Sequence, residues 1–212
     1  MLKRFVLPLL LASLLSTGAI APTLGQEPGA TDAVLGGRIE LPEAGYALTV
    51  PDDWVAIGPS LEDIDDIVET LEAIDPELAT TVEDALAGGG VGFSLLAFGH
   101  LDAERGFREN CNVIDGAADG TSLSVIAAGE AAAFAEMGDR LASGPDVSML
   151  ELPAGKVARI DYGLRYPNLD TAHAAYYFSD GTTLHLLTCT GLERAEDDWL
   201  SIAETFEILP GS

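Results

Sequence analysis

Residues 156 to 189 read KVARIDYGLRYPNLDTAHAAYYFSDGTTLHLLTC. Three runs rich in β-branched and aromatic residues, at 156–166, 171–178 and 182–189, are separated by PNLD and by the dipeptide Asp180-Gly181. Such runs, bounded by turn residues, are typical of strands, and Asp-Gly is a strong signal for a tight hairpin. The stretch therefore predicts consecutive antiparallel strands, preceded by a further strand at 147–153.

The turns also predict which residues of these strands face one another. A two-residue turn at Asp180-Gly181 places Tyr176 opposite His185. If the PNLD connection leaves Tyr166 opposite Thr171, the same counting places Asp161 opposite Tyr176. Side chains that face each other on neighbouring strands are close enough to interact. Asp161, Tyr176 and His185 would then form one row of an acid, a phenol and an imidazole, which is a candidate for proton transfer.

The same register has a simpler structural interpretation. The alternate residues of these strands form an apolar face, and they are Ile160, Tyr162, Leu164, Ala175, Tyr177, Leu184 and Leu186. Asp161 would then lie on a polar outer face together with Arg159 and Arg165, where charges pair across strands for little net gain. We favour this interpretation and expect no catalytic residues. Among the three histidines, none has the spacing of a paired metal site.

The segment GYALTVPDDWVAI, residues 45–57, begins the fold. A strand is expected at 46–50, paired with a short strand at 38–41. Pro51 is expected to end the strand because it cannot donate to the ladder, and Asp52-Asp53 are favourable turn residues. Adjacent acids on extended backbone point apart, so they are not a catalytic pair. Trp54 is expected to anchor the core.

Helical periodicity marks four further segments. The expected helices run from Ser60 to Ile74, from Pro76 to the glycines at 88–90, from Thr121 to Leu141, and from Ala195 to Phe206, where Trp199 is a second expected anchor. Strands are expected at 91–98 and at 110–114.

The N-terminus has the three parts of a secretory signal. Lys3 and Arg4 precede an apolar stretch at 5–15, and small residues follow it. The stretch is short for a membrane span. Cleavage is expected after Ala21 or after Gly25, and no cysteine follows that would indicate a lipid anchor. We therefore expect a signal peptide at 1–25, a flexible linker at 26–37, and a single domain at 38–212 that is exported and does not insert in the membrane.

The chain is strongly acidic, with 35 Asp and Glu against 10 Lys and Arg, and a net charge of -25. A phosphate backbone or an anionic lipid surface is repelled by such a charge, which disfavours nucleic-acid binding and binding to acidic membranes. The acidic stretch at 62–69 raises the possibility of a divalent cation site, but no EF-hand-like loop is present. We expect no metal and no cofactor.

Cys111 and Cys189 are the only two cysteines. In an exported chain an even count permits one disulfide. Neither residue has the CxxC spacing of a metal site or a sequence-adjacent activating group. A disulfide is the first interpretation, and two buried free thiols are the second.

The order of these elements resembles the PsbP-like fold of the Mog/PsbP proteins and of exported bacterial LpqN- and LpqT-type proteins. The residues that carry the resemblance are GYALTVPDDW, LPAGKVARIDYGL, AAYYFSDGTTLHLLTCTG and the final ETFEIL. The resemblance implies an α/β sandwich with a central antiparallel sheet flanked by helices. It brings no catalytic residues to this chain.

These observations predict an exported, non-catalytic binding or assembly module of the cell envelope, with an unknown protein or small molecule as its partner. One alternative is a secreted hydrolase that uses Asp161, Tyr176 and His185. Another is a carrier of cations or small molecules with a cleft beside the acidic helices.

Overall fold

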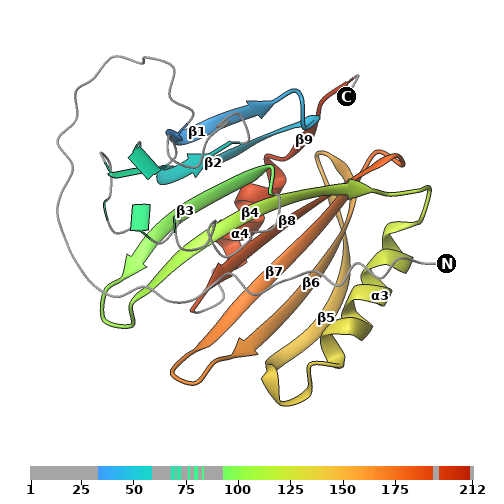
Figure 1. Cartoon of the computed structure of the whole chain (residues 1–212). Helices are drawn as coiled ribbons and strands as arrows, with labels where there is room; N and C mark the ends of the chain where they lie inside the picture. Colours follow the sequence, from blue (N-terminus) through green and yellow to red (C-terminus); the bar gives the residue numbers. More distant parts are fainter. Residues whose placement is uncertain are drawn as a thin grey trace.

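The computed structural model describes residues 33–58, 93–192 and 196–210, together with isolated positions between 68 and 83 (Figure 1). In these ranges the chain forms one nine-stranded antiparallel sheet. The strands run in the spatial order β1-β2-β3-β4-β8-β7-β6-β5, and the short β9 pairs with β2. The central antiparallel sheet predicted from the sequence is confirmed.

Sheet strands dominate the described ranges. The strands are β1 (Ala33–Leu41), β2 (Tyr46–Ile57), β3 (Leu95–Asp102), β4 (Phe107–Ala117), β5 (Leu141–Leu152), β6 (Gly155–Arg165), β7 (Asp170–Ser179), β8 (Thr183–Gly191) and β9 (Glu207–Ile208). The helices that lie within the described ranges are α3 (Leu123–Ala135), the 3₁₀ turn η1 (Gly138–Arg140) and α4 (Glu196–Glu204). The predicted sandwich with flanking helices therefore overstates the helical share of the described fold.

Two meanders of four strands make up the sheet. β1 to β4 follow one another as neighbours, and then α3 carries the chain to the far edge, from which β5 to β8 return toward the centre. The two meanders meet where β4 pairs with β8. At this seam Cys111 lies directly opposite Cys189, and the two form a disulfide. The disulfide predicted from the sequence is confirmed.

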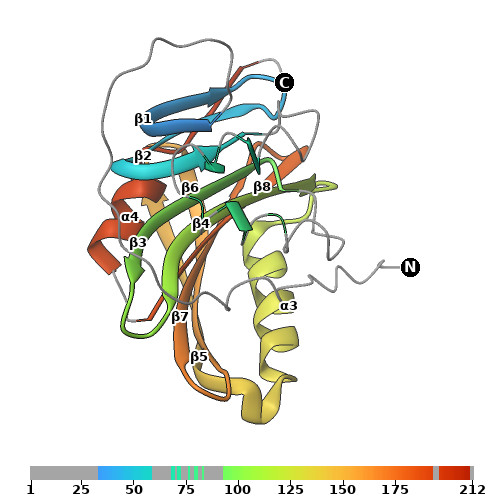
Figure 2. The ribbon, with the colours of Figure 1, turned by 60° about the vertical axis from the view of Figure 1, so that its left-hand side comes forward.

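Both faces of the central strands are buried, and Figure 2 shows α3 and α4 on opposite sides of the sheet. On the α4 side, Trp199 and Phe206 pack among residues of the central strands, including Tyr176 and Leu187. On the α3 side, Phe134 packs on Tyr162, with ring centroids 4.2 Å apart. The prediction of a polar outer face around Tyr176 is wrong, because α4 and the segment that follows it cover that face.

The strand that contains Pro51 does not end there, contrary to the sequence prediction. β2 continues to Ile57, and its pairing with β1 jumps from Gly37–Val50 to Leu35–Val55. Pro51 to Trp54 therefore bulge out of the ladder opposite Gly36. A Cβ at Gly36 would lie only 2.1 Å from the Pro51 carbonyl oxygen, so this close approach requires glycine.

Trp54 ends the bulge with its ring inside the core, where it is 5% exposed. Its indole lies over Gly99 of β3, and a Cβ at that glycine would be 2.4 Å from the ring. The bulge thus turns the tryptophan toward the α4 side of the sheet, and Asp52 and Asp53 remain exposed. The sequence predicted these two acids as turn residues, whereas both lie within β2, in the bulge.

Several boundaries differ from the sequence predictions. β1 begins at Ala33, so part of the expected linker is a strand. α3 ends at Ala135 rather than near Leu141, and β5 begins at Leu141 rather than at Val147. β9 was not predicted, because two residues carry no periodic signal. The expected helices at 60–88 lie largely outside the described residues, although Leu71 and Ala79 are helical and pack against Val55 and Phe98.

Candidate functional site

A cleft opens between β2 and the last turn of α4, beside the bulge. Its volume is about 310 Å³. The residues that line it are Thr49, Val50, Pro51, Asp52, Ser201, Ile202 and Thr205. The irregular VPD segment therefore forms one wall, and the end of a helix forms the other.

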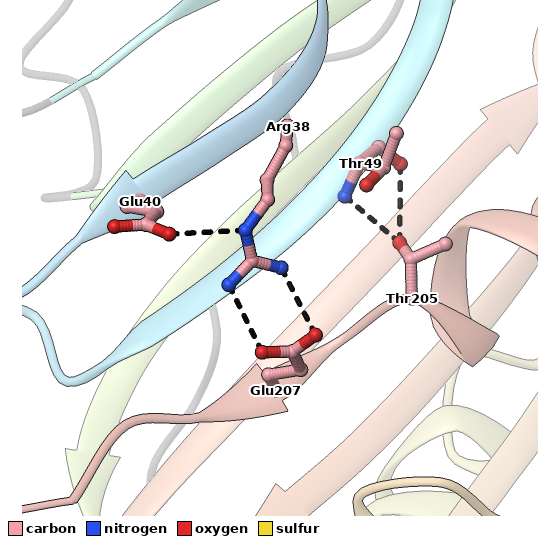
Figure 3. A network of polar contacts seen from close by, with 5 residues as sticks. All are labelled: Arg38, Glu40, Thr49, Thr205 and Glu207. Atoms are coloured by element: carbon pink, nitrogen blue, oxygen red, sulfur yellow. Dashed lines mark hydrogen bonds and ion pairs between the residues drawn. The ribbon is translucent and has the colours of Figure 1, made fainter.

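Thr205 fixes the two walls to each other (Figure 3). Its Oγ1 accepts a hydrogen bond from the Thr49 backbone N–H at 2.8 Å. The hydroxyl hydrogen has two carbonyl acceptors in range, Ile202 O at 2.7 Å and Thr49 O at 3.2 Å. Because Thr205 directly follows α4, one side chain ends the helix and holds the strand in place.

An ion-pair cluster lies beside this contact. Arg38 of β1, which is opposite Thr49, donates two hydrogen bonds to Glu207 of β9, at 3.0 and 2.9 Å (Figure 3). Its Nε donates to Glu40 at 3.0 Å. These two carboxylates hold the pKa of Arg38 above its ordinary value. The guanidinium is thus already paired, and the cluster ties the first strand to the last.

The lining limits what the cleft can do. Asp52 is the one ionisable side chain among the lining residues, and the other polar groups are three hydroxyls. Hydroxyls donate and accept hydrogen bonds but are poor acids and bases near neutral pH. The cleft therefore has the chemistry of a binding site, with an acceptor at Asp52 and an apolar floor of Val50, Pro51 and Ile202. Acid–base catalysis would need a second titrating group.

The predicted row of Asp161, Tyr176 and His185 does not form. All three lie on the α4 side of the sheet, but Asp161 is opposite Ala174, and His185 is opposite Phe178. Tyr176 lies opposite Arg159 and Leu187. Each pairing differs from the predicted register by two residues. A shift of two keeps every side chain on its face, which explains why the predicted apolar face is correct while the row is not.

The hairpin turn explains the shift at β7–β8. The Asp180 carboxylate accepts hydrogen bonds from the backbone N–H groups of Thr182 and Thr183, at 2.7 and 2.8 Å. The first paired residues are Ser179 and Leu184, so the loop has four residues rather than two. An acid that binds its own turn in this way favours the wider loop.

Asp161 is held by an arginine of its own strand. The Arg159 guanidinium donates to Asp161 Oδ1 at 2.7 and 3.0 Å, and only 11% and 13% of the two side chains are exposed. The guanidinium carbon also lies 5.4 Å from the centre of the Tyr176 ring. This pairing ties up the carboxylate that the hydrolase hypothesis needs as an orienting acid.

His185 forms a pair that the sequence did not predict. Its Nδ1 lies 2.7 Å from Asp115 Oδ1 on β4, and because a carboxylate accepts, the imidazole donates here. The ring is buried, with the Tyr46 ring 5.3 Å away and the Phe206 ring 5.6 Å away. Nε2 has no hydrogen-bond partner among the described residues.

A histidine–carboxylate pair can act as a general base only if the second ring nitrogen reaches a substrate. At His185 that nitrogen is enclosed by the core of the domain. The nearby hydroxyls are engaged with each other, because Tyr46 Oη and Ser94 Oγ are 2.8 Å apart and Ser94 also reaches the Val113 carbonyl. The cluster therefore stabilises the seam between β4 and β8. Only the pairing of β4 with β8 brings Asp115 to His185, and the sequence holds no local signal for that pairing.

The second expected anchor, Trp199, is fully buried and also carries a polar contact. Its indole N–H donates to Glu109 Oε1 of β4 at 2.6 Å. Burial raises the pKa of Glu109, and the negative charges of Asp198 and Asp53 act in the same direction. The hydrogen bond from Trp199 opposes this shift. The contact attaches α4 to β4 at the end of the helix away from the cleft.

Two further searches concern metals and membranes. Within the described ranges, no three His, Cys, Asp or Glu side chains lie together as a metal site would require. The acidic stretch at 62–67 lies outside those ranges. None of the described helices combines the length and the apolar character that a membrane crossing requires.

Comparisons with known proteins concern the fold alone. No protein-family model and no curated protein matches the chain. Among solved structures, the chain is similar to cyanobacterial PsbP from Synechocystis sp. PCC 6803, at 13% identity over 87% of this chain and 98% of that one, with a TM-score of 0.48. A protein from Bacteroides thetaiotaomicron VPI-5482 is similar at 12% identity over 82% of this chain and 49% of that one, with a TM-score of 0.44.

The first of these structures carries the name PsbP, the family that the sequence resembles. The narrower likeness to LpqN- and LpqT-type proteins stays a prediction.

Proposed function

We propose that this protein is a non-catalytic binding or assembly module of the cell envelope, and that the cleft between β2 and α4 is the surface that receives its partner. The observation that carries the proposal is the lining of that cleft. It offers the Thr49 hydroxyl, an apolar floor and the Asp52 carboxylate, which is its single ionisable group. The Ser201 and Thr205 hydroxyls line it as well, but both already donate to backbone carbonyls of α4. A site of this kind orients a ligand by hydrogen bonds and supplies no acid–base pair.

The state of the other candidate residues supports the same proposal. Asp161 is paired with Arg159, and His185 is paired with Asp115 inside the core. A hydrolase built on these residues would have to open the domain before its base met a substrate. The binding module needs no such rearrangement, because its cleft is already open to ligands.

The disulfide supports a location outside the cytoplasm. Cys111 and Cys189 are joined at the centre of the sheet, and such bonds persist in oxidising compartments. The secretory signal expected at 1–25 points to the same compartment. Together they support an exported protein that acts outside the cytoplasm.

A carrier of small molecules is the second candidate function, and the single carboxylate of the cleft favours it. The strong negative charge of the chain would attract a cationic molecule, and Asp52 would meet it.

Site-directed photo-crosslinking in the native envelope tests the binding surface. A photoreactive phenylalanine analogue replaces Ser201, which lines the cleft, or Val125, which is exposed on α3 on the other side of the sheet (Figure 2). We expect one discrete adduct from position 201 and none from position 125. Mass spectrometry of the adduct separates a protein partner from a small molecule. The same adducts from both positions, or none from either, would contradict the proposal.

A further inference from the structure

The second edge of the sheet, β5, is long and largely exposed. β5 has β6 on one side and no paired strand on the other among the described residues. Its outward edge therefore presents backbone donors and acceptors that can pair with another strand. The four residues from Asp146 to Met149 are all exposed. The edge strand is open to a partner here.

The two halves of β5 differ in how they are protected. Two register shifts fall between Leu141 and Asp146, and Pro145 stands within the second of them. Bulges and proline are devices that prevent edge strands from pairing with other chains. From Asp146 to Leu152 the pairing with β6 is regular. This half has neither a bulge nor a proline, and its only charged side chains are the exposed Asp146 and Glu151.

The regular half also carries exposed apolar side chains. The Val147 side chain is 46% exposed and the Met149 side chain is 48% exposed. Among the described residues, the other large hydrophobic residues that are exposed are Leu35 and Val125. Being two residues apart on one strand, Val147 and Met149 lie on the same face of the sheet. Covering them would remove apolar surface from water.

We propose that β5 pairs with the β5 of a second copy of this chain, antiparallel, about a two-fold axis through Ser148. In this register Val147 of each copy lies opposite Met149 of the other, on one face. On the other face Asp146 lies opposite Leu150 of the second copy, and the two Ser148 residues face each other. The pairing covers both exposed apolar residues with each other and places no acid opposite an acid.

The ladder is complete in this register whichever backbone groups point outward. In an antiparallel strand, alternate residues direct both N–H and C=O to the same neighbour. If these are the even-numbered residues, Asp146 pairs with Leu150 and Ser148 with itself. If they are the odd-numbered ones, Val147 pairs with Met149. In the symmetric register the even-numbered residues of one copy face the even-numbered residues of the other, and the odd-numbered residues face the odd-numbered ones.

Charge sets the conditions for this dimer. Each copy has a net charge of -25, so the two molecules repel each other at low ionic strength. The contact itself is short and has one apolar face, and the Pro145 residues of the two copies close it at its two ends. Salt screens the long-range repulsion and leaves the contact intact. The dimer is therefore weak and becomes tighter as salt rises. It uses no residue of the cleft.

Sedimentation equilibrium of the full chain, at low and at high sodium chloride, measures the association. Met149→Lys is compared with Val125→Lys, which makes the same charge change at an exposed residue of α3. Both substitutions lower the mutual repulsion, but only the first buries an ammonium group in the contact. We expect the dissociation constant of Met149→Lys to rise about tenfold or more, and that of Val125→Lys to stay equal or fall.

Crosslinking tests the register. In Ser148→Cys the two new thiols meet at the axis, and a short bismaleimide should link two chains. In Glu151→Cys the exposed thiols lie about 20 Å apart in the same dimer and should stay unlinked. A chain that is monomeric at every salt concentration overturns the proposal. So does a dimer that Met149→Lys leaves intact, or one that links through position 151 and not through position 148.

Discussion

His173 shows how completely a polar side chain can be satisfied inside this sheet. Its Nε2 lies 2.8 Å from the Thr171 hydroxyl and its Nδ1 lies 3.0 Å from the Thr190 hydroxyl. The ring stacks on Tyr162, with centroids 4.7 Å apart. Burial lowers the pKa of His173 to about 3. The neutral imidazole is therefore the form that the fold accepts.

This lowered pKa predicts a pH dependence of stability. In the unfolded chain His173 takes up a proton below pH about 6.5, whereas in the folded chain it stays neutral. The unfolded state therefore binds more protons, and stability is lost as the pH falls from 6.5 toward 3. Between pH 7 and pH 5 this one residue should cost about 2 kcal/mol of the unfolding free energy.

Urea unfolding of the wild type and of His173→Gln, at pH 7 and at pH 5, measures this contribution. The substitution lowers stability at both values, but the loss between them should be about 2 kcal/mol smaller than in the wild type. Carboxylates contribute equally to both proteins and cancel in the difference. Parallel losses in the two proteins would show that His173 does not titrate as its burial requires.

At the same scale, the candidate site shows what residue patterns could and could not predict. The burial of Trp54 and Trp199 follows from their size. Asp52 and Asp53 are exposed, but they lie in a strand bulge and not in the turn that their residue types predict. The pairing of His185 with Asp115 does not follow, because the two are 70 residues apart and meet only through a strand contact of the whole sheet. The cleft was missed for the same reason, since its two walls are β2 and α4.

Among the elements, β2 depends most on its irregularity. The bulge at Pro51 to Trp54 changes the direction of the strand, and it brings the Trp54 indole over Gly99, where the missing side chain leaves room for the ring. The sequence predicted that the strand ends at Pro51, and the structure has a bulge there instead. The sequence could not indicate that the strand resumes, because that depends on Gly36 of a neighbouring strand, which leaves room for the bulge.

The bulge predicts opposite outcomes for adjacent residues. Trp54→Ala removes a buried ring and leaves a cavity, and it should lower the free energy of unfolding by about 3 to 5 kcal/mol. Asp52→Asn changes an exposed side chain and should stay within about 0.5 kcal/mol of the wild type. Chemical denaturation of both variants makes the comparison. A large loss for Asp52→Asn with little loss for Trp54→Ala would show that the segment is held by its acids.

The strand registers illustrate a second limit at this scale. Strand identity and face follow from alternation, and the predicted apolar face of β6, β7 and β8 is the one that packs against α3. Loop length depends instead on hydrogen bonds of a single side chain, such as those of Asp180 to Thr182 and Thr183. An Asp-Gly pair is compatible with either loop, so the register could not be fixed in advance.

At the scale of the whole molecule, the disulfide joins the two four-stranded meanders, β1 to β4 and β5 to β8. β5 to β8 are joined by short turns, whereas residues 58 to 94 separate β2 from β3, and the two halves meet where β4 pairs with β8. Cys111 and Cys189 stand opposite each other in that seam, 78 residues apart in sequence. Export and an even cysteine count predicted the bond, but composition alone could not locate it at the junction of the meanders.

Net charge is a property of the whole molecule, and it acts on the folded state more than on the unfolded one. The charge of -25 is confined to a smaller volume in the compact chain, so self-repulsion opposes folding. Salt shortens the screening length from about 30 Å at 0.01 M to about 10 Å at 0.1 M. We therefore expect the melting temperature to rise with sodium chloride over this range.

A charge variant separates this screening from general effects of salt. Glu43→Lys with Glu104→Lys changes two exposed turn residues, and since each exchange adds two charges, the net charge moves from -25 to -21. The variant should melt at a higher temperature than the wild type at low salt, and the difference should shrink as salt screens both proteins. Calorimetry at several salt concentrations gives the two curves. A difference that persists at high salt would assign the effect to the substituted turns and not to the charge of the molecule.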